Sequence, residues 1–221
     1  MSMRMAASYI QKMTQTLIYV HDPLCGWCFG FTEAISHVAK SFPDLSIEIR
    51  LGGLVTGDRI APYATLHDYV KANSSKMQSV TGARIGDAFL NERLPSQTLM
   101  SSHPPNCAIL TVRETESARA LDFTIAVQDA HFVDGADLNQ PELYSRIACD
   151  LNLPTVSFEI PPPHDVPASL LSEYKATHAL NFSGYPSLFV RSTTGEQPPV
   201  SLSYDGPTLI KTLYQMGVVP A

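Results

Sequence analysis

Hydrophobic and polar residues near the start of the chain predict a strand, a helix and a second strand. Residues 16–20 form an unbroken apolar and β-branched run, typical of a strand buried on both faces. Apolar residues then recur from Phe31 to Val38 at the i, i+3, i+4, i+7 spacing of an amphipathic helix. From Leu45 to Leu51 they alternate strictly with polar residues, which predicts a strand with one solvated face. This order predicts a parallel βαβ unit with a right-handed crossover.

The pattern changes after this unit, and residues 55–182 contain no convincing strand. Most of this segment reads as helix. Helices are expected over residues 65–80, 84–93 and 167–181. Residues 105–132 are expected to form two helices or one kinked helix, and a further helix is expected to begin at an N-cap at Asn139.

Strand-like alternation returns near the end of the chain. Residues 187–190 form a compact apolar run, and Val200, Leu202 and Tyr204 alternate as a second strand, so an antiparallel hairpin is expected. A last helix begins after Asp205 and ends at Gly217. The predicted fold is therefore α/β, with a mixed four-stranded sheet in the order βαβ…ββα.

This order divides the chain into three segments. Residues 16–54 and 183–217 form the two halves of the sheet domain, and residues 55–182 are a helical insertion between them. Residues 1–15 read as a loosely docked lead-in.

Composition narrows the classes of function. Hydrophobic residues make up 44% and charged residues 16%, which is ordinary for a folded globule. A net charge of −6 without a basic stripe argues against nucleic-acid binding. No apolar run reaches the length of a membrane span, and the N-terminus lacks the apolar stretch of a secretory signal. We therefore expect a cytoplasmic protein without nucleic-acid or membrane partners.

The segment Cys25-Gly26-Trp27-Cys28 lies between the first strand and the first helix. A cysteine at a helix N-terminus meets unpaired backbone N–H groups and the positive end of the helix dipole, which favour a thiolate. Cys25 is thus the expected nucleophile. Cys28, one helical turn further on, is placed to attack a mixed disulfide formed at Cys25. The motif predicts thiol–disulfide exchange.

Other interpretations of the cysteines and of their neighbours are weaker. A zinc site needs a second cysteine pair at similar spacing, and Cys107 and Cys149 are too far apart in sequence to supply one, so no metal is expected. Cys107 reads as a small buried residue and Cys149 as partly exposed. His21 could adjust the reactivity of Cys25 or could simply end the strand, and the second interpretation is favoured.

Residues 22–31, DPLCGWCFGF, resemble the active-site segment of the DsbA family, above all its cytoplasmic-type members described as predicted protein-disulfide isomerases. Residues 183–189, SGYPSLF, resemble the cis-proline loop that faces the CxxC motif in thioredoxin-like proteins. The resemblance implies a thioredoxin fold interrupted by a helical domain. It also implies a cis Tyr185–Pro186 bond, with the Tyr185 backbone pairing with substrate.

The resemblance further implies the roles of the residues around the cysteines. Asp22, Pro23 and Gly26 would support the active-site turn. The expected substrates are protein or peptide thiols and disulfides. The redox-active Cys25–Cys28 disulfide would need no further cofactor, with glutathione as a candidate reductant.

One departure from the family pattern concerns the residues between the cysteines. Gly-Trp stands where strongly oxidising DsbA proteins have Pro-His, so no imidazole in the motif stabilises a thiolate and a less oxidising protein is expected. Trp27 either forms an apolar plate beside the site, where it would contact substrate, or packs between the two domains.

Two other functions remain open on the sequence. Kappa-type glutathione transferases and chromene-carboxylate isomerases share this fold, but they characteristically have Ser at the position of Cys25 and lack the second cysteine. A redox-inert binding module on the same fold is the other alternative. Tyr63, Tyr69, Met77 and Phe89 could line a substrate groove, but aromatic and Met residues at helical spacing are more often core, and no groove residue is assigned.

Overall fold

The computed structural model describes residues 15–154, 156–192 and 194–218 of the chain. Its main sheet has the strand order β2–β1–β5, formed by β1 (Thr16–His21), β2 (Ser46–Leu51) and β5 (Ser187–Arg191). β1 pairs parallel with β2 and antiparallel with β5. The parallel βαβ unit is thus confirmed.

The central strand β1 is buried on both faces, as its unbroken apolar sequence predicts. Leu17 and Tyr19 belong to the main hydrophobic core. Ile18 and Val20 point the other way and pack with Phe189 in a smaller cluster. Successive side chains of a strand alternate between faces, so His21 follows Leu17 and Tyr19 on the main-core face.

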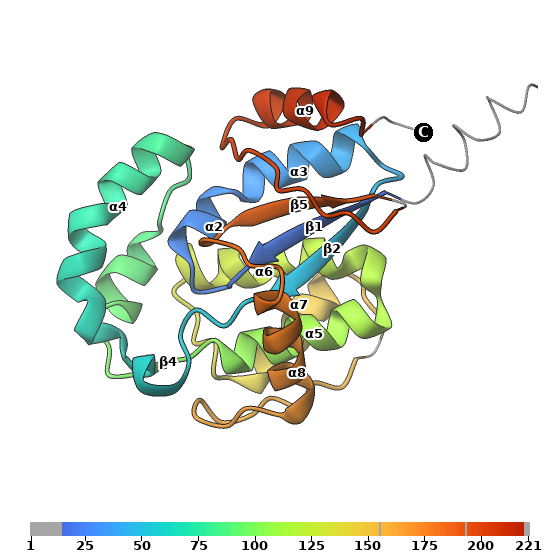
Figure 1. Ribbon diagram of the computed structural model, residues 1–221. Coiled ribbons are helices and arrows are strands. Elements are labelled where there is room, and N and C mark those ends of the chain that lie inside the picture. The colour runs from blue at the N-terminus through green and yellow to red at the C-terminus, as the bar shows by residue number, and fades with distance from the viewer. Residues whose placement is uncertain (1–14, 155, 193, 219–221) are drawn as a thin grey trace, which may run out of the picture.

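The helices that cover the sheet come from distant parts of the chain. α3 (Thr32–Ser41) and α9 (Gly206–Gln215) pack against each other on one side, whereas α5, α6 and α8 contact β2 on the other (Figure 1). These three span His103–Thr115, Ala120–Phe132 and Ala168–His178, and the remaining helix of this block is α7 (Pro141–Asp150). Two helices therefore occupy the predicted 105–132 segment.

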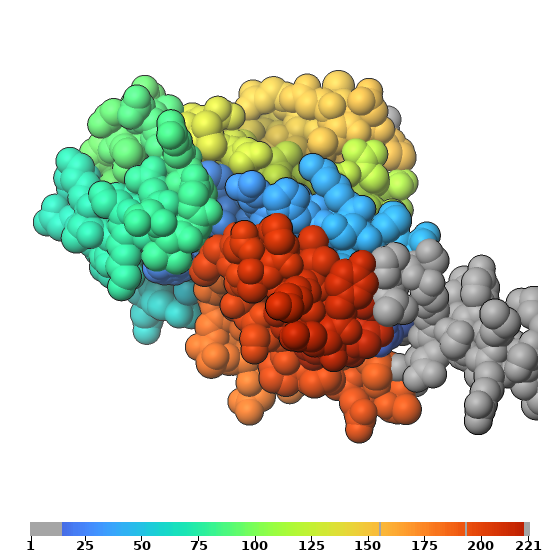
Figure 2. All heavy atoms as spheres, turned by 90° about the horizontal axis from the view of Figure 1, so that it is seen from above, coloured from blue at the N-terminus to red at the C-terminus, as the bar shows by residue number. Residues whose placement is uncertain are grey.

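The helix α4 (His67–Thr81) stands apart from this block. Seen from above, the region around it forms a separate lobe beside the sheet domain, while α9 lies next to α3 (Figure 2). Only Met77 and Thr81 of α4 are buried. The first part of the predicted 84–93 helix is absent, and a short turn of π-helix, η3 (Phe89–Arg93), lies near its end. Three single 3₁₀ turns complete the segment: η1 (Gly57–Arg59), η2 (Tyr63–Leu66) and η4 (Ser117–Arg119).

The helix after β1 begins earlier than its apolar stripe suggests and is interrupted. α2 (Gly26–Gly30) ends where the N–H of Phe31 donates to the carbonyl oxygens of Cys28 and Phe29, and α3 follows directly. The stripe itself is buried as predicted. The turn that carries the cysteines is thus a short helix of its own.

The predicted fourth strand is reduced to a single bridge in the described part of the chain. Phe189 pairs with Pro199, and Val200 N–H donates to Leu188 O at 2.9 Å. The expected strand through Leu202 and Tyr204 does not form. The pairing is confined to residues 198–200, where Val190 N–H donates to Pro198 O at 3.1 Å, and the two prolines there have no N–H of their own to add to the ladder.

Two smaller expectations for the insertion also need correction. The segment is not free of strand, because β3 (Ala61–Pro62) and β4 (Leu99–Met100) form a short antiparallel pair. Asn139 is not the N-cap of α7. That position is Gln140, and the Asn139 side chain donates to Leu99 O instead. The predicted lead-in over residues 1–15 lies almost wholly outside the described residues.

Among the helices of the described residues, none has both the length and the apolarity needed to cross a bilayer.

Candidate active site

The Cys25 side chain caps the short helix α2. Cys25 occupies the N-cap position, and its Sγ accepts a hydrogen bond from the Cys28 N–H at 3.4 Å. The Cys25 N–H in turn donates to Asp22 O at 3.0 Å, which closes the turn between β1 and the helix. The sulfur therefore sits at the positive end of the helix, where negative charge is stabilised.

The two cysteines differ in accessibility. Both are free thiols, with Cys25 7% exposed and Cys28 fully buried. Burial, together with the adjacent Cys25, raises the pKa of the Cys28 thiol well above its usual range. Cys28 is thus held as a neutral thiol behind Cys25, and only Cys25 reaches the surface.

The loop before β5 completes the site from the other end of the chain. The Tyr185–Pro186 peptide bond is cis, as the resemblance implies. The Cys25 thiol lies 3.7 Å from Tyr185 O and donates to it. The Tyr185 ring fits against Gly52, where an added Cβ would lie 2.1 Å from Tyr185 Cε1. Glycine at position 52 therefore leaves the space that the end of the Tyr185 ring occupies.

Asp22 lies at the centre of the turn and is fully buried. Its carboxylate accepts hydrogen bonds from the N–H groups of Leu24 and Leu54 at 3.0 and 2.8 Å. It also accepts from Ser102 Oγ at 3.0 Å and Asn106 Nδ2 at 3.3 Å. Burial raises the pKa of Asp22, and these hydrogen bonds oppose the rise. Asp22 joins the active-site turn to the loop after β2 and to α5.

The other two residues expected to support the turn make smaller contributions. Pro23 is buried within the turn. Gly26 opens α2, and a Cβ added there would meet no atom within 4 Å. Close packing therefore does not account for a glycine at this position.

His21 makes no hydrogen bond to either thiol in the described part of the chain. Its ring is fully buried, burial lowers its pKa to about 3, and neither ring nitrogen has a hydrogen-bond partner among the described residues. It lies 5.3 Å from the Tyr19 ring. This favours the interpretation that His21 ends the strand as a neutral, packed side chain.

Tyr19 and Tyr204 are neighbours of the thiols that the sequence analysis did not identify. Burial, and next the proximity of Cys28, raise the pKa of Tyr19. Tyr204 packs 5.8 Å from the Trp27 ring, and it belongs to the segment that fails to form the fourth strand. Tyr19 could have been found from alternation, because it shares a face of β1 with His21, directly before the turn.

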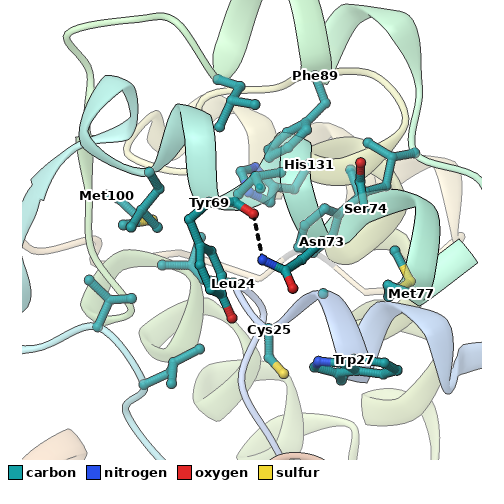
Figure 3. Close-up of a pocket in the computed structure, with 18 of the residues that line it drawn as sticks. Leu24, Cys25, Trp27, Tyr69, Asn73, Ser74, Met77, Phe89, Met100 and His131 are labelled. Atoms are coloured by element: carbon teal, nitrogen blue, oxygen red, sulfur yellow. Dashed lines mark hydrogen bonds between the residues drawn. The ribbon is translucent and has the colours of Figure 1, made fainter.

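Trp27 is half-buried between Tyr204 and a pocket that runs from Cys25 under α4. The pocket has a volume of about 430 Å³ (Figure 3). Tyr63, Tyr69, Met77 and Phe89 all line it. Core packing, which was favoured for them, is confirmed for Tyr63, Met77 and Phe89, which are buried in a second hydrophobic cluster, whereas Tyr69 is 65% exposed. Helical spacing alone could not show that this cluster also borders a cavity.

The remaining cysteines lie away from this site. Cys107 is buried and Cys149 is exposed, as predicted. Burial raises the pKa of Cys107 to about 12, so this thiol is unreactive at neutral pH. Among the described residues, no three His, Cys, Asp or Glu side chains are grouped as metal ligands would be.

Comparisons with known proteins identify the fold. No protein-family model and no curated protein matches the chain. A candidate protein disulfide isomerase from Nitrosomonas europaea is similar at 21% identity, covering 91% of this chain and 98% of that one with a TM-score of 0.72.

Two further structures show the same likeness. The cytosolic disulfide reductase DsbM from Pseudomonas aeruginosa in complex with GSH has a TM-score of 0.74 at 17% identity, over 92% of this chain and 100% of DsbM. A DsbA oxidoreductase candidate from Streptomyces coelicolor has a TM-score of 0.61 at 15% identity, over 94% and 92% of the two chains. The chain has the DsbA-like thioredoxin fold with a helical insertion.

Proposed function

We propose that this protein is a thiol–disulfide oxidoreductase in which Cys25 is the nucleophile and Cys28 the resolving cysteine. The observation that carries the proposal is the hydrogen bond from the Cys28 N–H to Cys25 Sγ, at the N-terminus of a helix that buries Cys28 completely. This arrangement places the less buried sulfur at a helix N-terminus, where a backbone N–H points at it, and keeps the second sulfur one turn away.

The proposed reaction begins with attack of the Cys25 thiolate on a substrate disulfide. A Cys25–substrate disulfide forms, and the other substrate sulfur leaves as a thiolate. Cys28 then loses its proton and attacks Cys25 Sγ, which releases the second substrate thiol and leaves a Cys25–Cys28 disulfide. Its raised pKa keeps Cys28 protonated at neutral pH, so resolution requires a proton acceptor at the moment of attack.

The Tyr185 backbone is placed to orient the substrate. Its carbonyl oxygen lies 3.7 Å from Cys25 Sγ, so a polypeptide whose sulfur reacts there would lie beside the backbone at Tyr185 and Pro186. Trp27 would contact the same substrate from the other side of Cys25. These contacts support protein or peptide disulfides as substrates.

The direction of the reaction is proposed to be reduction in the cytoplasm, with glutathione as reductant. Two observations support this: the fold resembles a cytosolic disulfide reductase whose structure also contains GSH, and the motif lacks the histidine of the strongly oxidising proteins. An isomerase activity would use the same two cysteines.

The proposal is tested by thiol alkylation before and after mild oxidation. The exposed Cys149 would also react, so the measurement belongs in a Cys149→Ser background. When the samples are alkylated after denaturation, we expect the oxidised protein to have two fewer alkylatable thiols than the reduced protein and to regain them with glutathione. Insulin reduction should vanish in Cys25→Ser, and Cys28→Ser should accumulate the mixed disulfide. Full insulin reduction by Cys25→Ser would refute the assignment, and tight glutathione binding without exchange would favour the kappa-type alternative.

A further inference from the structure

Three parts of the fold surround the end of the cavity that lies beside Cys25. The active-site turn contributes Cys25 and Trp27, and the cis-proline loop contributes Tyr185. The roof comes from α4, through residues such as Val70, Ser74 and Met77. In Figure 3 the side chains of Asn73, Ser74 and Met77 hang over Cys25 and Trp27. A group bound here would therefore lie next to the reactive sulfur.

Packed aromatic rings line the part of the cavity away from Cys25. Phe89 contacts Phe132 with ring centroids 5.3 Å apart, and Phe132 is backed by Phe29, which stacks on it at 4.9 Å without lining the cavity itself. Tyr63 meets Phe89 edge-on at 6.4 Å. These residues form a second hydrophobic cluster, distinct from the main core. Such surfaces favour another aromatic ring, in edge-to-face or offset contact.

The lining of the cavity, among the described residues, offers no charged side chain to pair with a charged ligand. Among the described residues that line it there is no Lys, Arg, Asp or Glu. Its one titratable imidazole, that of His131, is neutral at ordinary pH because burial lowers its pKa to about 3. His131 Nε2 lies 3.5 Å from Tyr63 Oη, and His131 Nδ1 lies 3.5 Å from Ala136 O. Burying an unpaired charge among these groups would be strongly unfavourable.

The volume of the cavity suits a small molecule. At about 430 Å³ it falls within the range of roughly 300–1,000 Å³ typical of sites for low-molecular-weight ligands. Several of the residues around it are fully or largely buried, among them Met77, Leu94 and Phe132. A polypeptide backbone would bring unpaired N–H and C=O groups into this apolar space.

We propose that the cavity under α4 binds the uncharged aromatic group of a low-molecular-weight disulfide whose sulfur reacts with Cys25. This inference rests on the proposed function and adds a second substrate class for the same site, beside the protein or peptide disulfides that would bind along the Tyr185 backbone. The ring would occupy the space between Phe89 and Trp27, and the disulfide would reach back to Cys25.

The chemistry is a two-electron reduction of the ligand. Cys25 thiolate attacks R–S–S–R, a Cys25–S–S–R bond forms, and RS⁻ leaves and takes a proton from water. Cys28 gives its proton to water and attacks Cys25 Sγ, so that the second RS⁻ leaves and the protein dithiol becomes a disulfide. Two molecules of glutathione would return it to the dithiol and form glutathione disulfide.

The test compares two aromatic disulfides that differ in charge. 4,4′-Dithiodipyridine is uncharged at pH 7, whereas 5,5′-dithiobis(2-nitrobenzoate) carries a carboxylate on each ring. The matched variants are Ser74→Trp, which fills the cavity, and Ser75→Trp on the exposed side of the same helix, both in a Cys149→Ser background. We expect Ser74→Trp to slow the reaction with the uncharged disulfide about tenfold or more. Its reaction with the charged disulfide, and both reactions of Ser75→Trp, should stay within about twofold of the parent.

A binding measurement separates this inference from the proposed function. The uncharged fluorescent probe N-phenyl-1-naphthylamine should bind the Cys25→Ser/Cys28→Ser protein. Binding should be lost on adding Ser74→Trp, kept with Ser75→Trp, and unaffected by excess reduced glutathione.

The outcomes are distinct. Absence of probe binding, or an equal loss of both disulfide reactions in Ser74→Trp, overturns the inference. A parent protein that reduces neither disulfide faster than Cys25→Ser overturns the proposed function, and with it the link between the cavity and the sulfur, even if the probe binds.

Discussion

Replacing Asp22 by alanine should destabilise the protein strongly, because one buried carboxylate satisfies four donors. Two are backbone N–H groups, of Leu24 and Leu54, and two are the side chains of Ser102 and Asn106. A buried donor left without a partner costs about 1–3 kcal/mol. The cost of four such losses is offset in part, because alanine also removes a buried carboxylate. The raised pKa of Asp22 shows that burying its negative charge is unfavourable. We expect Asp22→Ala to lower the free energy of unfolding by about 3–5 kcal/mol.

Asparagine at the same position provides a graded control. One oxygen remains to accept from Leu24 N–H and Ser102 Oγ, while the new amide group faces the other two donors. Asn106 can turn its own amide over so that its Oδ1, which has no partner among the described residues, accepts from the new NH₂, but its Nδ2 then leaves Tyr174 Oη, to which it donates at 3.1 Å. The Leu54 N–H and the Asn106 NH₂ group then lose their acceptors, so Asp22→Asn should cost about 2–3 kcal/mol, less than Asp22→Ala.

The assay is urea unfolding followed by circular dichroism and by the fluorescence of Trp27, the only tryptophan in the chain and a neighbour of this turn. Asp22→Ala should shift the midpoint further than Asp22→Asn, with the denaturant slope unchanged. An alanine variant within about 0.5 kcal/mol of the parent would refute the reasoning, since that is the range of an ordinary surface substitution. Equal losses in both variants would contradict the rearrangement of Asn106.

Three further predictions follow from other parts of the structure. A glutathione equilibrium should give a reduction potential well below about −120 mV, the DsbA value, because Gly-Trp supplies no imidazole to the motif; a value near −120 mV would contradict this. In the native protein iodoacetamide should modify Cys149 but leave Cys107 unmodified until urea is added. Mass spectrometry of the labelled peptides measures this, and labelling of Cys107 before Cys149 would contradict the prediction. Burial opposes ionisation of Glu173, but the hydrogen bonds and positive charge of Arg113 lower the pKa of Glu173 overall. The ionised carboxylate therefore stabilises the folded protein at pH values above the ordinary Glu pKa, and this stabilisation is lost as the pH falls through the lowered pKa. Glu173→Gln should therefore flatten the loss of stability at acid pH, and an unchanged pH profile would exclude this role.

The sequence predicted the parts of the fold that depend on local pattern. The apolar run of β1, the stripe from Phe31 to Val38 and the N-cap at Asp205 each produce the expected element. The placement of Cys25 at a helix N-terminus followed from the same pattern. These features depend on neighbours a few residues apart, which a single sequence shows directly.

The fourth strand shows where local pattern is not sufficient. Val200, Leu202 and Tyr204 alternate as a strand would, yet the pairing with β5 is confined to residues 198–200, two of which are prolines. Tyr204 instead packs against Trp27 and Phe31, beside the motif. Packing against a distant helix therefore prevails over strand-like alternation.

The least predictable part of the site is its connection to the insertion. Asp22 was expected to support the turn, but nothing in its neighbourhood in sequence identifies Ser102 and Asn106, some 80 residues away, as its partners. The same holds for His131, which reaches the cavity from the end of α6. Such contacts depend on how the helical block folds back on the sheet, and one sequence carries no periodic signal for them.

Gly30 influences the shape of the cavity under α4, although it does not line that cavity. It ends α2 on the side away from the reactive sulfur, and a Cβ there would lie 2.6 Å from Thr81 Cγ2. Thr81 is the last residue of α4 and one of only two buried in that helix. A single methyl group at position 30 would displace the end of α4 and so alter the height of the roof at Ser74 and Val70. Related chains could therefore change the ligands they accept by exchanging a residue that never touches them.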